Sequence, residues 1–165
     1  MESSLGPKDL EKPETTGTTI MAVAYDGGVV VAADSRTSMG SFIPDRTTDK
    51  LEYLSDKIFC LRSGSAADTQ LICHHVRHYL GMHSIELGKT PYVKTAANLF
   101  RQILYNNKDY LLAGIIIAGW DPYEGPQVFS LPLGGSCTKV PYAIGGSGSG
   151  FIYGYCDANF KEKMT

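Results

Sequence analysis

The residues that could do chemistry gather around a threonine-rich stretch, TTGTTIMAV, at positions 15–23. A threonine hydroxyl is a weak nucleophile unless a base stands beside it. If the chain is cut before Thr18, the new α-amino group of that residue can be the base, because its ordinary pKa of about 7.7–8.0 leaves part of it neutral near pH 7. Gly17 has no Cβ and would let the peptide reach the strained geometry in which Thr18 attacks the preceding carbonyl. The alternative interpretation is a threonine-rich linker beside an edge strand.

Three further positions could support such a nucleophile. Asp34 ends the apolar run GGVVVAAD, where a carboxylate beside buried strands needs a cation, and Lys50 in TTDKLEY could supply it. An ammonium group near an amine also disfavours protonation of that amine. Gly64 precedes a predicted helix start, where backbone N–H groups and the helix dipole can stabilise an oxyanion. Taken singly, Asp34 with Lys50 is better explained as a surface ion pair, and the Gly64 region as a simple helix cap.

Two other motifs carry less information. His74 and His78 are four residues apart, as in helical metal sites, but the glutamate of HExxH and a third ligand are missing. A solvated helix face is therefore the preferred interpretation. The loop GGSGSG at 145–150 lacks the GxxxxGK[ST] phosphate-binding pattern, so we interpret it as a tight turn that offers serine hydroxyls.

The bulk properties are those of one globular domain. The chain has 165 residues, 43% of them hydrophobic, and its net charge of −2 indicates neither a nucleic-acid nor a membrane partner. The longest apolar run, at 110–120, is well short of the roughly 20 residues of a membrane span. The chain has four widely spaced cysteines, Cys60, Cys73, Cys137 and Cys156. They form no CxxC pair, and with no secretory signal they indicate reduced thiols in a cytosolic or nuclear protein rather than a zinc site.

The elements that must position these residues begin after a polar, flexible extension at 1–17. Strand-like runs at 18–25 and 29–34 are joined by an Asp-Gly-Gly turn, and 51–54 with 57–64 forms a second hairpin. A helical pattern follows, with Ser65 as its N-cap and Asp68 as the acidic partner of a capping box.

A second helix is predicted to open at Thr90–Pro91, a cap followed by a proline in the first turn. A buried strand at 111–120 then pairs with 126–135, and a short helical stretch covers 153–159. Two helices between antiparallel strands predict a layered α+β domain.

Several motifs, in this order, closely resemble proteasome β-type subunits: TGTTIMAV, GGVVVAADSRT, TDKLEYL, IFCLRSGSAADTQ, IIIAGWDP and AIGGSGSGFIYGYCDA. Within that family the chain is most similar to the constitutive, caspase-like β1 type. The resemblance implies an N-terminal-nucleophile hydrolase fold, an αββα sandwich. Residues 1–17 would be a propeptide removed by autolysis between Gly17 and Thr18, and 18–165 the β-type domain. We expect neither a cofactor nor a metal ion.

The resemblance also implies catalytic roles. Thr18 would be the nucleophile, and its freed amine the base, acting through water. Lys50 would lower the pKa of that amine, and Asp34 would hold Lys50 in place. The Gly64 amide would form the oxyanion hole, and Ser147 would hydrogen-bond around the amine.

A specificity pocket is implied in the same way. Arg62 matches the basic residue at the floor of the β1 pocket, which implies cleavage after acidic residues. Thr37, Thr48 and Ala66 would line that pocket.

The implied partners are other proteasome β and α subunits in stacked seven-membered rings, and the substrates are unfolded polypeptides. The expected location is the cytoplasm and nucleus, with neither nucleic acid nor membrane as a partner. The family continues beyond the equivalent of Thr165. We therefore expect the chain to lack the C-terminal part of its domain, to expose the apolar faces of the strands at 111–120 and 126–133, and to have little peptidase activity alone.

That incompleteness leaves an alternative function of another class, a non-catalytic structural or assembly component of the β ring. Inactive β subunits usually lose the glycine–threonine junction or the lysine. Gly17, Thr18, Asp34 and Lys50 are all present here, which favours the threonine endopeptidase.

Overall fold

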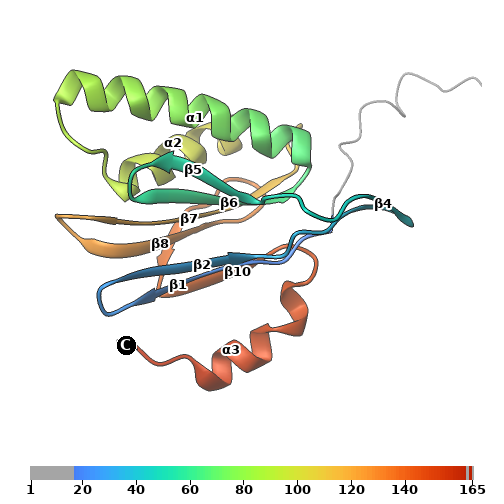
Figure 1. The fold of residues 1–165 in the computed structure, drawn as a ribbon. Helices are drawn as coiled ribbons and strands as arrows, with labels where there is room; N and C mark the ends of the chain where they lie inside the picture. Colours follow the sequence, from blue (N-terminus) through green and yellow to red (C-terminus); the bar gives the residue numbers. More distant parts are fainter. Residues whose placement is uncertain (1–16, 163, 165) are drawn as a thin grey trace, which may run out of the picture.

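The computed structural model describes residues 17–162 and 164, so the predicted propeptide lies outside the described residues except for Gly17. Two stacked sheets lie between helices, in four layers (Figure 1). The helices α1 (Ala66–Leu87) and α2 (Val93–Asn106) cover the outer face of a five-stranded sheet, and α3 (Tyr153–Asn159) lies beyond the three-stranded sheet. Among the described helices, none combines the length and the apolar character needed to cross a membrane.

The five-stranded sheet is antiparallel throughout and consists of β5 (Leu51–Ser55), β6 (Ile58–Gly64), β7 (Ala113–Asp121), β8 (Gly125–Leu131) and β9 (Thr138–Val140). In the other sheet, β1 (Ile20–Tyr25) lies between β2 (Gly28–Ala33) and β10 (Tyr142–Gly145). A separate ribbon pairs β3 (Thr37–Met39) with β4 (Phe42–Asp45), and the 3-10 turn η1 (Ser149–Phe151) precedes α3. The predicted hairpins, the buried strand with its partner and the last helix are confirmed, whereas β3, β4, β9 and β10 were not predicted.

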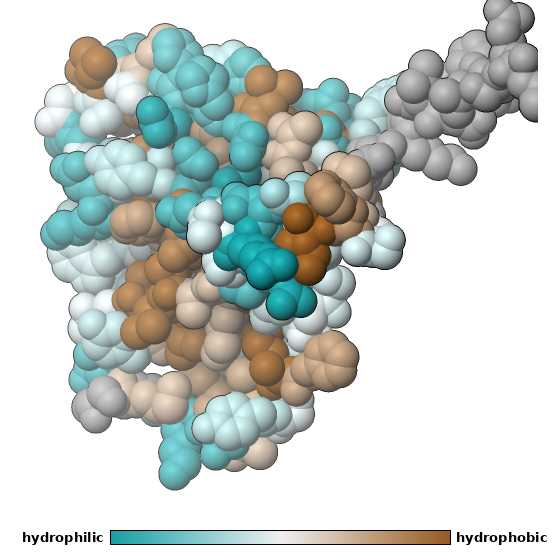
Figure 2. Space-filling model, turned by 45° about the vertical axis from the view of Figure 1, so that its right-hand side comes forward, coloured by the Kyte–Doolittle hydropathy of each residue, from teal (hydrophilic) through white to brown (hydrophobic). Residues whose placement is uncertain are grey.

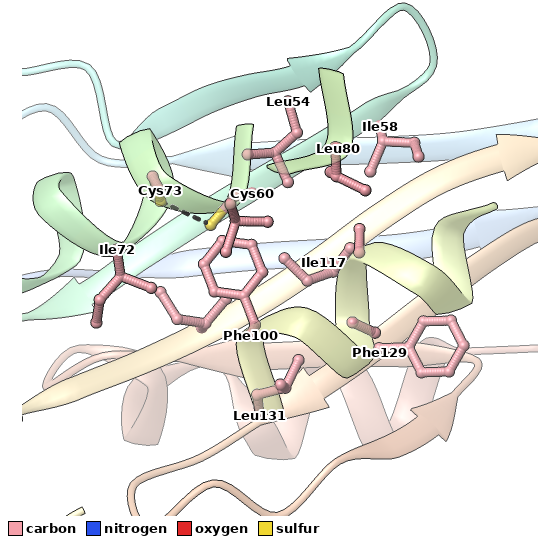
Figure 3. Close-up of a cluster of buried hydrophobic side chains, with 14 of the residues drawn as sticks. Leu54, Ile58, Cys60, Ile72, Cys73, Leu80, Phe100, Ile117, Phe129 and Leu131 are labelled. Atoms are coloured by element: carbon pink, nitrogen blue, oxygen red, sulfur yellow. Dashed lines mark hydrogen bonds between the residues drawn. The ribbon is translucent and has the colours of Figure 1, made fainter. Parts of the chain in front are cut away.

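Two hydrophobic cores join the layers, and alternate side chains of the central strands enter each one. On β7, Ile115 and Ile117 belong to the core beneath α1 and α2, whereas Ile116 and Ala118 belong to the core between the sheets. Figure 3 shows the helix-side core, with Phe100 of α2 among side chains from α1 and the sheet. Burial on both faces explains the unbroken apolar run of β7. The expectation of exposed apolar faces is therefore wrong for β7 and β8, whose large aliphatic side chains are buried.

The start of α1 is held by Leu112, the residue just before β7. Ser65 is the N-cap, as predicted, and its hydroxyl accepts the backbone N–H of Asp68 at 3.3 Å. The predicted capping box does not close, because the Asp68 carboxylate accepts the backbone N–H of Leu112 at 3.1 Å. The Ser65 N–H in turn donates to the Leu112 carbonyl at 2.8 Å. His74 and His78 are exposed, which confirms a solvated helix face.

The predicted start of α2 is two residues too early, and a distant residue caps this helix. The helix begins at Val93 rather than at Thr90–Pro91. The Val93 N–H donates to the carboxylate of Asp121, at the end of β7, at 3.1 Å. The same carboxylate accepts from the side-chain amide of Gln127 at 2.6 Å and from two backbone N–H groups of the β7–β8 turn, those of Tyr123 and Glu124. One buried carboxylate thus closes a hairpin and caps a helix.

We expect Asp121→Asn to lower the free energy of unfolding by about 2–4 kcal/mol at pH 7, because an amide group would face these donors with its own N–H. Burial by itself raises the pKa of Asp121, but the hydrogen bonds from Glu124, Val93 and Gln127 outweigh it and lower the pKa. Stability from this group is therefore full above the ordinary carboxyl pKa and is lost as the pH falls through the lowered value.

Urea unfolding of both proteins between pH 2 and pH 7 measures this difference, which should shrink toward the acid end. Exposed Asp109 provides the matched control, Asp109→Asn, with an unchanged midpoint. Equal midpoints for Asp121→Asn and the unaltered chain at pH 7 would contradict the assignment of the cap.

Candidate active site

Thr18 lies just before β1, where the glycine–serine loop crosses it. The residue is 5% exposed. Its backbone N–H donates to the hydroxyl of Ser147 at 3.3 Å, and its carbonyl accepts the N–H of Gly148 at 3.0 Å. The pairing of β10 with β1 ends at Gly145 opposite Ile20. The loop that follows β10 therefore lies directly against Thr18.

The loop at 145–150 packs closely against the backbone of Thr18, and the closest approach requires a glycine. Gly146 has a φ of +87°, and a Cβ at this position would overlap the carbonyl group of Thr18. The tight turn that was predicted for 145–150 is present. The Ser147 hydroxyl faces the Thr18 backbone, as the family resemblance implies, although its part in chemistry stays a prediction.

The ammonium group of Lys50 contacts two of the other predicted residues, Gly17 and Asp34. It donates to the carboxylate of Asp34 at 2.7 Å, to the carbonyl of Gly17 at 2.8 Å and to the carbonyl of Arg36 at 2.7 Å. The Lys50 side chain is 6% exposed, so the interpretation as a surface ion pair does not hold. A buried ammonium with three acceptors is fixed in position, directly beside the peptide bond between Gly17 and Thr18.

Hydrogen bonds to both oxygens of Asp34 make it a suitable partner for this cation. One carboxylate oxygen accepts from Lys50 and from the backbone N–H of Thr19 at 2.7 Å, and the other accepts from the N–H of Arg36 at 3.1 Å. Partial burial raises the pKa of Asp34, but the hydrogen bonds from Lys50 and Thr19 outweigh it, and the pKa lies below its ordinary value. Asp34 is therefore a carboxylate at neutral pH.

A small pocket beside Thr18 collects the residues that were predicted to bind substrate. Its walls are Thr18, Thr37, Thr48, Lys50, Arg62, Ser63, Gly64, Ala66 and Thr69. The Thr37 and Thr48 hydroxyls are hydrogen-bonded to each other at 2.7 Å. Ser63 and Thr69 were not predicted. Thr69 could have been found, because it lies three residues after Ala66 and therefore on the same face of the first turn of α1.

A larger, mostly apolar cavity of about 400 Å³ lies between the two sheets beside this pocket. The two share Ser63 and Gly64, and the cavity is also lined by Gly146 and Ser147. In the space-filling view a hydrophobic band crosses the molecule at the level of the sheets, below the helices α1 and α2 (Figure 2). The small polar pocket and the apolar cavity are therefore neighbours that share part of one wall.

Helix, sheet, sheet and helix in four layers, with a threonine at the head of a central strand and a buried lysine beside it, define the N-terminal-nucleophile hydrolase fold. Residues 14–165 match the family described as "Proteasome subunit". The chain belongs to this family, among its β-type subunits.

Three relatives illustrate the similarity. The chain is 56% identical to proteasome subunit beta type-6 of Dictyostelium discoideum over 159 residues, which are 96% of this chain and 74% of that protein. It is 57% identical to the probable proteasome subunit beta type-1 of Schizosaccharomyces pombe over 149 residues, 90% of this chain and 66% of that protein. It is 54% identical to proteasome subunit beta type-1 of Saccharomyces cerevisiae, over 94% of this chain and 73% of that protein.

Proposed function

We propose that the chain is a threonine endopeptidase subunit of the proteasome core, made as a precursor and cleaving polypeptides after acidic residues. The observation that carries this proposal is the Lys50 ammonium, 2.8 Å from the Gly17 carbonyl and 2.7 Å from the Asp34 carboxylate. A cation in this position polarises the carbonyl that Thr18 would attack. If the threonine-rich stretch were only a linker, nothing in it would require a buried lysine that donates to the Gly17 carbonyl.

In the processing step, the Thr18 hydroxyl oxygen attacks the carbonyl carbon of Gly17. The new C–O bond forms as the C–N bond breaks, and the hydroxyl proton passes to the nitrogen, which leaves an ester and a free amine. Water then hydrolyses the ester, so that Thr18 regains its hydroxyl and Gly17 carries the new carboxyl group. Residues 1–17 are released as the propeptide.

In peptide cleavage, the released amine takes the proton of the Thr18 hydroxyl through a water molecule. Lys50 favours the neutral amine, since two cations side by side repel each other. Gly64, in the wall of the same pocket at the entrance to α1, is suited to stabilise the oxyanion, because the positive end of the helix dipole lies there. Asp34 holds the Lys50 ammonium in place through their ion pair.

Specificity for acidic side chains follows from Arg62, which contributes a cation to the wall of a pocket otherwise formed largely by hydroxyl groups and small residues. A carboxylate entering this pocket gains a charge-assisted hydrogen bond with the guanidinium. We propose that the subunit works with other β and α subunits in stacked seven-membered rings on unfolded polypeptides, in the cytoplasm and nucleus.

The test uses core particles that contain this chain. Intact mass should show the loss of residues 1–17, a threonine-directed electrophile should label Thr18, and a peptide with Glu before the cleaved bond should be hydrolysed faster than the same peptide with Gln. An uncut and unlabelled chain in an otherwise assembled particle would overturn the endopeptidase. That result would instead support the structural or assembly component.

A further inference from the structure

We propose that Glu52 sets how strongly the pocket prefers an acidic side chain. Its carboxylate is an internal counter-ion of Arg62, and Arg77 on the surface of α1 draws the same carboxylate away from the pocket. This inference rests on the proposed function, because it concerns the specificity of the pocket beside Thr18.

The three charges lie in a row from the pocket to the helix surface. One carboxylate oxygen of Glu52 is 3.7 Å from Nε of Arg62, and the other is 3.8 Å from a terminal guanidinium nitrogen of Arg77. The sheet register explains the arrangement, since Glu52 of β5 pairs with Cys60 of β6, two residues before Arg62 on the same face. The helix α1 packs over that face and contributes Arg77.

Arg62 is buried but its hydrogen bonding is incomplete. The side chain is 8% exposed, and one terminal nitrogen donates to the carbonyl of Asp49 at 2.8 Å. Its Nε has no hydrogen-bond partner among the described residues, because 3.7 Å to Glu52 is beyond hydrogen-bonding distance. The carboxylate of Asp49 is turned to the backbone N–H of Leu51. Glu52 therefore balances the charge of the guanidinium but accepts no hydrogen bond from its Nε.

A substrate carboxylate must share Arg62 with Glu52. The Glu52 carboxylate attracts the guanidinium and repels an incoming carboxylate, and with a side chain 31% exposed it is only partly screened by water. Arg77 opposes both effects, but it is 52% exposed and acts more weakly. Removing the charge of Glu52 should strengthen the preference for acidic side chains, and removing the charge of Arg77 should weaken it.

The experiment uses core particles that carry the unaltered chain, Glu52→Gln or Arg77→Gln. The readout is the ratio of kcat/KM for a peptide with Glu before the cleaved bond to that for the matched peptide with Gln. We expect Glu52→Gln to raise this ratio about three- to tenfold, mainly through KM, and Arg77→Gln to lower it by about twofold. Both changes should shrink as the salt concentration rises. Glu124→Gln removes a carboxylate from a distant, half-exposed pair with Lys139 and should leave the ratio unchanged.

The possible failures can be told apart. If the unaltered particle does not prefer Glu to Gln, the proposed acidic specificity is wrong. If it does, and Glu52→Gln lowers the ratio or leaves it unchanged, the inference is overturned and the role of Glu52 is to orient Arg62 or is purely structural. Should Glu52→Gln fail to assemble, Arg77→Gln on the helix surface decides, because an unchanged or higher ratio in that variant also contradicts the inference.

Discussion

Thr18→Ala is expected to abolish both the removal of residues 1–17 and the hydrolysis of acidic peptides, with activity at least about 10³-fold lower. The change deletes the hydroxyl that attacks in both proposed reactions and leaves a smaller side chain in a buried position. The backbone contacts of Thr18 with Ser147 and Gly148 do not depend on the side chain, so the fold around the site should persist. Intact mass and steady-state hydrolysis by assembled particles measure the two effects.

The neighbouring threonine supplies the matched control. Thr19→Ala removes the same atoms one position later, and the backbone N–H of Thr19 can still donate to Asp34. We expect this variant to be processed and to keep its activity within a few-fold. If Thr18→Ala behaves like Thr19→Ala, the stretch is a threonine-rich linker and the nucleophile lies elsewhere.

Local patterns in the sequence were sufficient for much of the fold. The hairpin β1–β2, the hairpin β5–β6 and the doubly buried strand β7 follow from alternation and turn residues within a few positions of one another. The cap of α2 could not be found in this way, because Asp121 lies 28 residues beyond Val93 and meets it only after the sheet has formed. The strand β10 is too short to show a pattern, and its pairing with β1 spans more than a hundred residues.

In the candidate site too, some features follow from the local sequence and others only from tertiary packing. Residue chemistry suggested Thr18, Asp34, Lys50 and Gly64, but left a surface ion pair as the simpler explanation of Asp34 with Lys50. Only tertiary packing settles that point, since it buries the ammonium and sets it on the Gly17 carbonyl. No sequence pattern predicted the pairing of Glu52 with Arg77, because the two residues lie on β5 and α1 and meet only when the helix packs on the sheet.

Lys50→Met is expected to stop processing and to lower peptidase activity by about 10²–10³-fold, because it removes the cation while keeping much of the side-chain length. The variant also leaves the Asp34 carboxylate without its partner, which raises the pKa of Asp34 toward or above its ordinary value. Hydrolysis by assembled particles and intact mass are again the measurements. Lys89→Met, at an exposed position after α1, is the control that should change neither.

Processing and catalysis by Lys50 can be separated by producing the chain with Thr18 already as its first residue, released from a cleavable fusion partner. Without the neighbouring cation the pKa of the Thr18 amine should rise, so the residual activity of Lys50→Met should need a higher pH than that of the unaltered chain. A pH profile that is shifted in this way assigns Lys50 to the tuning of the base. A profile of unchanged position and height would show that Lys50 serves only to hold the strands together, and the mechanism built on a neutral amine would then fail.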